Sequence, residues 1–261
     1  MRFSNYTNTA LAAAKAGADV LLSHYNGILN IEYKGETDPV TQADKNAQKA
    51  VIKVIKDVFP QHGVLAEEEG VKETNKDYCW IIDPLDGTVN FVHGIPMFCV
   101  SIGLKYKDDI IAGIIYAPLM REVFMAEKGK GSWLNGKKIE VSKNKDIIKS
   151  LAGTGFPYYF RKDSKRVMKN FYNIVHETQG VRRLGSAALD LAYVACGRFE
   201  FFWEEGLKPW DIAAGILIVK EAGGTISDYG GTENSLLNGT ILAANNLATQ
   251  DKVLGIMNGK R

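Results

Sequence analysis

A short apolar run that ends in two aspartates constrains this sequence more than any other feature. In the stretch WIIDPLDGTVNFVHGIP, residues 80–82 are apolar, Asp83 and Asp86 stand three residues apart, and Gly87 and Thr88 follow at once. The apolar run predicts a buried strand. Because Asp, Pro, Gly and Thr are turn residues, the segment after it could be a tight turn. It could equally be a metal site that also holds a phosphate, and the rest of the sequence must decide between the two.

The composition is that of a soluble globular protein. With 261 residues, of which 46% are hydrophobic and 24% charged, the chain can form one large domain or two packed subdomains. A net charge of +2 without a long basic block predicts no nucleic-acid partner. No segment is apolar enough to span a bilayer, and Lys15 and Asp19 interrupt the one apolar stretch near the N-terminus. We therefore expect a cytoplasmic protein without membrane contact.

The cysteines support the same compartment. Cys79, Cys99 and Cys196 are widely spaced, form no Cys-x-x-Cys pair and lie in apolar surroundings. This usage predicts buried thiols in a reducing environment rather than disulfides.

The pattern of predicted elements changes near residue 150. Helical periodicity marks residues 5–25 and 44–59, and short strands are predicted at residues 64–66, 80–82, 99–104, 110–116 and 122–126. Asn135 and Gly136 predict a tight hairpin turn. Strands and helices then alternate up to residue 228. We predict an α+β subdomain at residues 1–150 with most of the metal ligands, and an α/β subdomain at residues 151–261 that completes the active site.

Acidic residues occur in four short contexts along the chain. They are Asp38 and Asp44 in TDPVTQAD, three glutamates at residues 67–69, Asp83 and Asp86 after residues 80–82, and Asp211 at the start of a predicted helix. Taken singly, each has a structural explanation. Asp44 and Asp211 could cap helices, and the glutamates could form a solvated turn.

As a set, these carboxylates favour a site for a hard divalent cation. Mg²⁺ uses a few protein carboxylates together with water and substrate phosphate oxygens. Asp83 and Asp86, coming from one tight turn, could bind two adjacent ions, and the carbonyl of Leu85 lies between them in sequence. The backbone N–H groups of Gly87 and Thr88 could hold a phosphate.

Several segments together resemble the inositol monophosphatase family. The stretches WIIDPLDGTVNFVHGIP and WDIAAGILIVKEAGG are similar to its two signature segments, and DPVTQAD, AEEE and LGSAALDLAYVACGRFEFFWEEGLKPWD follow in the expected order and spacing. The family is one branch of the Mg²⁺-dependent, Li⁺-sensitive phosphatases, which also include fructose-1,6-bisphosphatases. The resemblance covers nearly the whole chain. It implies a layered αβαβα sandwich, a homodimer, two to three Mg²⁺ ions per site and inhibition by Li⁺.

The resemblance also implies roles for individual residues. The implied metal ligands are Glu67, Asp83, the Leu85 carbonyl, Asp86 and Asp211. The implied catalytic residues are Glu67, Asp44 and Thr88, the last two as the pair that orients the attacking water. The implied substrate contacts are Asp86, Gly87, Thr88, Ser186, Ala187 and Glu204, with the last three on the hydroxyls of the sugar or polyol.

The predicted activity is that of a Mg²⁺-dependent phosphomonoesterase acting on inositol 1-phosphate by direct attack of water. Aromatic residues at 156–160 and Trp203 could instead line a site for a larger ester, or simply pack. The alternatives on the same fold are therefore an NADP(H) 2′-phosphatase, a fructose-1,6-bisphosphatase and a nucleotide 3′-phosphatase. An aspartyl-phosphate mechanism needs one residue between its aspartates, whereas Asp83 and Asp86 have two. A non-catalytic metal-dependent binding protein would be expected to have lost part of the carboxylate set.

Overall fold

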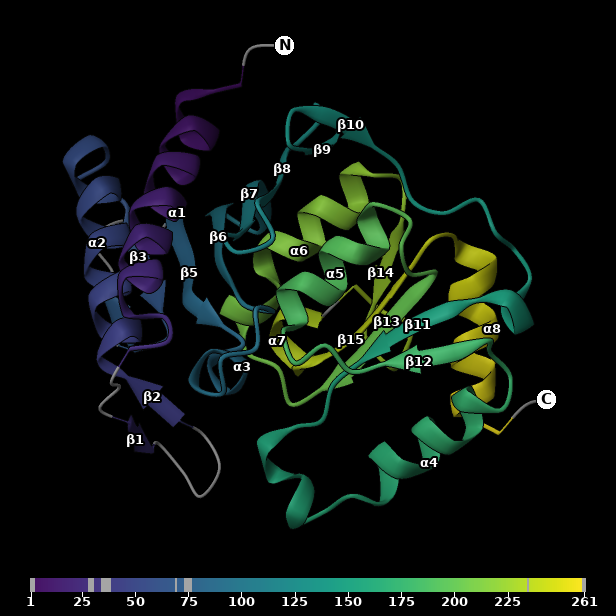
Figure 1. Cartoon of the computed structure of the whole chain (residues 1–261). Coiled ribbons are helices and arrows are strands. Elements are labelled where there is room, and N and C mark those ends of the chain that lie inside the picture. The colour runs from purple at the N-terminus through teal and green to yellow at the C-terminus, as the bar shows by residue number, and fades with distance from the viewer. Residues whose placement is uncertain are drawn as a thin grey trace.

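Helices and sheets alternate in five layers in the computed structural model, which describes residues 3–27, 31–33, 39–68, 70–72, 77–233 and 235–259. Helices α1 (Asn5–His24) and α2 (Gln42–Val58) form one outer layer, and α4 (Lys165–Val175) and α8 (Leu247–Met257) form the other. Helices α5 (Ala187–Ala195) and α6 (Pro209–Glu221) lie between two sheets (Figure 1). The predicted αβαβα sandwich is confirmed.

The larger sheet comes from the first half of the chain. Its eight strands lie in the order β10-β9-β8-β7-β6-β5-β3-β4. Their bounds are β3 (Gly63–Ala66), β4 (Gly70–Lys72), β5 (Tyr78–Asp86), β6 (Cys99–Tyr106), β7 (Asp109–Ala117), β8 (Glu122–Glu127), β9 (Ser132–Leu134) and β10 (Lys137–Ile139). All neighbours are antiparallel except β3 and β5. Asn135 and Gly136 have φ angles of 49° and 77°, which confirms the predicted hairpin turn.

Alternation along β5 explains how this sheet buries both faces. Trp80 and Ile82 pack against α1 and α2, whereas Ile81 packs with α5 and α6 on the opposite face. At its end, β5 can therefore direct polar side chains toward helices α5 and α6, on the face that Ile81 shares.

The smaller sheet comes from the second half and is mixed. Its five strands lie in the order β12-β11-β13-β15-β14. Their bounds are β11 (Leu151–Thr154), β12 (Gly180–Arg182), β13 (Phe201–Glu205), β14 (Thr225–Ser227) and β15 (Thr240–Ala244). Strands β12, β11 and β13 are parallel, whereas β15 is antiparallel to β13 and β14. The sequence interpretation ended at residue 228 and so missed β15 and α8.

Shorter elements complete the chain. They are β1 (Ile31–Tyr33), β2 (Pro39–Thr41), α3 (Thr88–Val92), α7 (Ser235–Asn238) and the 3₁₀ turns Ile147–Lys149 and Tyr158–Arg161. Helices α5 and α6, from the second half, share one apolar cluster with strands of the first sheet. A division of the chain near residue 150 stays a prediction. Among the residues described, no helix combines the length and the apolar character needed to cross a membrane.

Candidate active site

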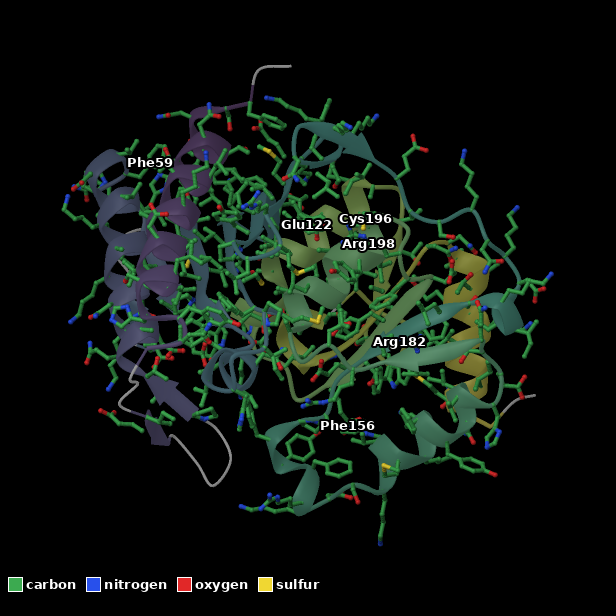
Figure 2. All side chains as sticks on the ribbon, in the orientation of Figure 1. Phe59, Glu122, Phe156, Arg182, Cys196 and Arg198 are labelled. Atoms are coloured by element: carbon green, nitrogen blue, oxygen red, sulfur yellow. The ribbon has the colours of Figure 1, made fainter. Side chains whose placement is uncertain are left out.

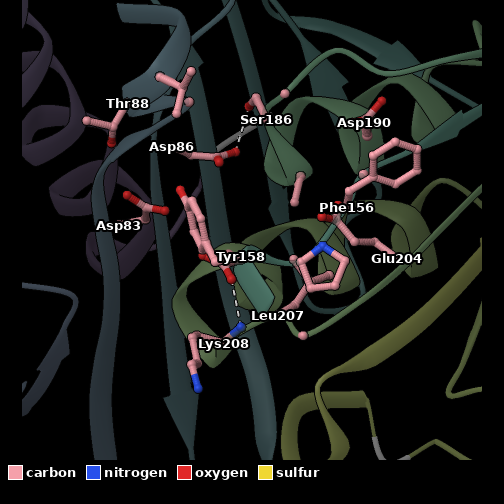
Figure 3. Close-up of a pocket in the computed structure, with 18 of the residues that line it drawn as sticks. Asp83, Asp86, Thr88, Phe156, Tyr158, Ser186, Asp190, Glu204, Leu207 and Lys208 are labelled. Atoms are coloured by element: carbon pink, nitrogen blue, oxygen red, sulfur yellow. Dashed lines mark hydrogen bonds between the residues drawn. The ribbon is translucent and has the colours of Figure 1, made fainter. Parts of the chain in front are cut away.

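One pocket of about 510 Å³ collects most of the residues singled out from the sequence. It lies where the end of β5 meets the first turns of α5 and α6 (Figure 3). The predicted site residues on its wall are Glu67, Asp83, Leu85, Asp86, Gly87, Thr88, Ser186, Ala187, Glu204 and Asp211. Asp44 is not on the wall, but it is hydrogen-bonded to Thr88. Asp38 and Glu69, which the sequence also indicated, lie outside the described residues.

The two central aspartates lie in an irregular strand end rather than in a turn that follows the strand. Strand β5 continues through Asp86, and its pairing with β6 shifts register between Asp83 and Asp86. Within this bulge the Leu85 N–H donates to Asp83 Oδ1 at 3.0 Å. The prediction of a tight turn directly after residue 82 is therefore wrong, because pairing with β6 resumes beyond the bulge.

Gly87 lets the chain turn from this strand end into α3. Its φ is 94°, in the left-handed region, and a Cβ at this position would lie 2.8 Å from the carbonyl oxygen of Met97. Both observations require glycine here. Thr88, whose backbone N–H is one of the predicted phosphate donors, directly follows as the first residue of α3.

Asp86 is bound to the first turn of α5. Its Oδ2 accepts hydrogen bonds from the Ser186 hydroxyl at 2.6 Å and from the Ala188 N–H at 2.7 Å. The same Ser186 hydroxyl accepts from the Leu189 N–H at 3.3 Å and thereby caps α5. In this structure the Ser186 side chain thus fixes Asp86.

Asp44 and Asp211 both cap helices, as their simpler explanation required, and both also belong to the site. Asp44 Oδ2 accepts from the N–H and hydroxyl of Thr41 at 2.8 and 2.6 Å, which closes a capping box on α2. Its Oδ1 accepts from the Thr88 hydroxyl at 3.2 Å. Asp211 Oδ2 accepts from the Lys208 N–H at 2.6 Å at the start of α6. Capping holds each carboxylate in one orientation.

Buried, mutually repelling carboxylates dominate the electrostatics at the end of β5. Burial, followed by repulsion from Glu67, Asp86 and Asp211, raises the pKa of Asp83 well above its ordinary value. Burial likewise raises the pKa of Asp86 to about 6, although hydrogen bonds from Ser186 and Ala188 oppose it. The pKa of Asp211 is also raised well above normal, first by burial.

The chemistry of these donors fits a hard divalent cation. Glu67, Asp83, Asp86 and Asp211 can provide oxygen ligands, and repulsion from neighbouring carboxylates contributes to the raised pKa of Asp83 and of Asp211. A cation bound among them would remove this repulsion. Within the part of the chain that the structure describes, however, no three His, Cys, Asp or Glu side chains stand close enough together to enclose an ion.

The opposite end of the pocket is built by the second half of the chain. Glu204 lies in β13 and is half-buried, and Phe156, Tyr158 and Phe160 also line the pocket. Phe156 and Phe160 stack with ring centres 5.0 Å apart. Trp203, by contrast, is buried in the core beneath α4 and α8, so its role is packing.

Asp190 is a pocket residue that the sequence interpretation missed. Asp190 lies on α5, on the pocket wall, with an exposed fraction of 1%. It is the one charged residue of an otherwise apolar helix, AALDLAYVA, and that isolation was the available signal.

Comparison with known proteins agrees with the resemblance seen in the sequence. Residues 3–259 match the inositol monophosphatase family. A protein from Mesorhizobium japonicum named inositol-1-monophosphatase is 43% identical over 237 residues, which are 90% of this chain and 89% of that protein. Nus factor SuhB of Pseudomonas aeruginosa is 41% identical over 247 residues, covering 91% of this chain and 90% of that protein.

A solved structure shows the same fold. The extragenic suppressor protein suhB from Bartonella henselae superposes with a TM-score of 0.93 at 38% identity, over 97% of this chain and 98% of that one. The chain therefore belongs to the inositol monophosphatase family and is a phosphatase.

Proposed function

We propose that this phosphatase is a Mg²⁺-dependent phosphomonoesterase that hydrolyses inositol 1-phosphate to inositol and phosphate. The observation that carries the proposal is the gathering of Glu67, Asp83, Asp86 and Asp211 on one pocket wall. Four carboxylates gathered on one wall make a poor site for a phosphate dianion on its own, because like charges repel. They make a suitable one for cations that in turn bind phosphate.

The ions would be held by the side chains of Glu67, Asp83, Asp86 and Asp211 and by the carbonyl of Leu85, which lies on the pocket wall. We propose two to three Mg²⁺ ions per site. When bound, they would supply neutralisation of the phosphate charge and acidification of the attacking water.

Thr88 and Asp44 are positioned to orient that water. The Thr88 hydroxyl donates its proton toward Asp44 Oδ1 at 3.2 Å and the Leu85 carbonyl at 3.0 Å. Its oxygen then has lone pairs left to accept a hydrogen bond from water. Water held in this way keeps its own lone pair for the phosphorus atom. As the new bond to phosphorus forms, the bond from phosphorus to the ester oxygen breaks, so no covalent enzyme intermediate is needed. The attacking water would release its proton to solvent, and the leaving alkoxide would take one from solvent.

Substrate choice is tested by a panel of esters assayed in Mg²⁺. The panel holds inositol 1-phosphate, NADP, fructose 1,6-bisphosphate and a nucleoside 3′,5′-bisphosphate. We expect inositol 1-phosphate to give the highest kcat/KM. A higher value for any other ester would replace the proposed substrate with that one. On the family resemblance we also propose inhibition by Li⁺, a homodimer and a cytoplasmic location.

A second candidate is a binding function in addition to catalysis, since some relatives bear the name Nus factor SuhB. The observation against the non-catalytic binding protein considered from the sequence is the retained set of Glu67, Asp83, Asp86, Thr88 and Asp211 on one wall. No phosphate release from any ester of the panel would contradict the catalytic function.

A further inference from the structure

Asp190 is a buried carboxyl group without a complete set of partners. Its exposed fraction is 1%, and within the described chain its Oδ1 has no hydrogen-bond partner. A buried polar atom left unpaired destabilises the folded state, so a fold normally pairs it. Asp190 nevertheless lines the pocket, at the end away from Asp83 and Thr88 (Figure 3).

Glycine stands at two positions next to the carboxyl groups of Asp190 and Glu204, one in strand β11 and one just after it. A Cβ at Gly153 would lie 2.6 Å from Asp190 Oδ1, and a Cβ at Gly155 would lie 2.1 Å from Glu204 Oε2. Neither glycine has a left-handed backbone that would itself require glycine. The requirement is for space, and the space is filled by two carboxyl groups from different elements, α5 and β13.

The charges around the carboxyl groups of Asp190 and Glu204 indicate which kind of ligand could bind there. Burial, and then repulsion from Glu204 and Asp86, raises the pKa of Asp190, while the Arg183 guanidinium opposes the shift. Arg183 is exposed, with its guanidinium 5.9 Å from the centre of the Phe156 ring. A hydroxyl group both donates and accepts, so it can pair with a carboxyl group in either protonation state.

We propose that Asp190 is a specificity-determining residue that, beside Glu204, hydrogen-bonds a hydroxyl group on the alcohol part of the substrate. The site would thereby select phosphate monoesters of polyhydroxylated alcohols. This inference rests on the proposed function and adds a residue to it. Asp190 would act in binding the alcohol and not in the attack on phosphorus, because Thr88 and Asp83 lie at the other end of the pocket (Figure 3).

The test compares two substrates that differ in hydroxyl groups. Inositol 1-phosphate carries hydroxyls on its leaving group, whereas p-nitrophenyl phosphate carries none. Asp190→Leu replaces both carboxyl oxygens by methyl groups and keeps the branched shape, and Asp190→Asn retains one acceptor and adds a donor. Circular dichroism and thermal unfolding of each variant establish that it is folded.

We expect Asp190→Leu to lower kcat/KM for inositol 1-phosphate about tenfold or more, mainly through KM, as for loss of a hydrogen bond to a charged or buried group. Asp190→Asn should retain most of the wild-type value. For p-nitrophenyl phosphate both variants should stay within about twofold of wild type.

Equal losses on the two substrates would overturn the inference, because they would show a structural role only. Unchanged kinetics on both substrates would overturn it as well. If Asp190→Leu does not fold, the same comparison on Asp190→Ala, which also removes both carboxyl oxygens, decides: an unaltered ratio of kcat/KM between the two substrates would contradict the proposal. Failure of the wild-type protein to release phosphate from either ester would contradict the proposed function itself.

Discussion

The hydroxyl of Ser186 donates a hydrogen bond of 2.6 Å to Oδ2 of Asp86, although the two residues are 100 positions apart in the sequence. The bond ties the end of β5, in the larger sheet, to the first turn of α5, between the sheets. Ser186 also caps α5 through the Leu189 N–H. One side chain therefore orients a predicted metal ligand and stabilises a helix that forms the pocket wall.

Replacing Ser186 by Ala should affect stability and activity together. Loss of the cap and of the bond to a buried carboxylate should lower the free energy of unfolding by about 1–3 kcal/mol. Release of Asp86 should also lower kcat. Urea denaturation and phosphate release measure the two effects. Ser186→Thr, which keeps the hydroxyl, is the matched control and should retain most of both; equal behaviour of the Ala and Thr variants would contradict the role.

Removing the Thr88 hydroxyl should affect activity far more than stability. Thr88→Val is nearly isosteric but cannot bond to Asp44 Oδ1 or to water. We expect kcat to fall about 10²-fold or more, which is the lower end of the rate contribution of general acid–base catalysis. KM should change little. Thr88→Ser is the control and should stay within about tenfold of wild type. A Val variant as active as the Ser variant would exclude Thr88 from orienting the water.

The sequence predicted local structure well where a charged or polar residue stands at the start of a predicted helix. The αβαβα fold followed from the resemblance, and the capping roles of Asp44, Ser186 and Asp211 agree with their places at helix starts. The bulge between Asp83 and Asp86 could not be predicted, because it depends on how β6 pairs with β5 across the sheet.

Other features depend on contacts that a linear pattern does not contain. The bond between Ser186 and Asp86 joins distant segments. The unpaired oxygen of Asp190 is recognisable only once α5 lies against the strand that carries Gly153. Strand β15 is short, and helix α8 begins with an Asn246 cap that was overlooked, although its side chain accepts from the Thr249 N–H at 2.9 Å.

The ionised carboxylate of Glu127 should stabilise the fold, and this stabilisation should be lost in acid. Its Oε2 accepts from the Ser4 N–H at 2.8 Å and from the Thr7 hydroxyl at 2.6 Å, which fixes the start of α1 (Figure 2 shows all side chains on the ribbon). Burial raises its pKa, but bonds from Lys130, Thr7 and Ser4 outweigh burial and lower the pKa from 4.5 to about 2.

Because the folded pKa is depressed, the stabilisation is present above pH 4.5 and is lost as the pH falls toward 2. Glu127→Gln should therefore lower the free energy of unfolding by about 2–3 kcal/mol at pH 7, and the difference from wild type should shrink as the pH drops through that window. Urea denaturation at several pH values measures it. The control is Glu233→Gln, at an exposed ion pair with Lys220, which should change stability little. A difference for Glu127→Gln that does not vary with pH would contradict this account.

Gly155→Ala should damage substrate binding. The added Cβ would lie 2.1 Å from Glu204 Oε2, so the carboxyl group must move. We expect KM for inositol 1-phosphate to increase several-fold, because the binding free energy of roughly one hydrogen bond would be lost. Gly180→Ala is the matched control, because its Cβ would lie 3.3 Å from the flexible Arg182 side chain and 3.7 Å from Leu151 Cδ1, which is ordinary contact. Similar kinetics for the two variants would show that the position of Glu204 does not matter.

Whether these carboxylates form a metal-dependent phosphatase centre is decided by the rate of phosphate release from inositol 1-phosphate by chelator-treated protein as Mg²⁺ is added back. We expect negligible release without Mg²⁺, a saturable recovery with it, and severe loss of that recovery in the folded Asp211→Asn variant. Full activity of the chelator-treated protein, unchanged by Mg²⁺ and by the Asp211→Asn substitution, would contradict the claim that these carboxylates form a metal-dependent phosphatase centre.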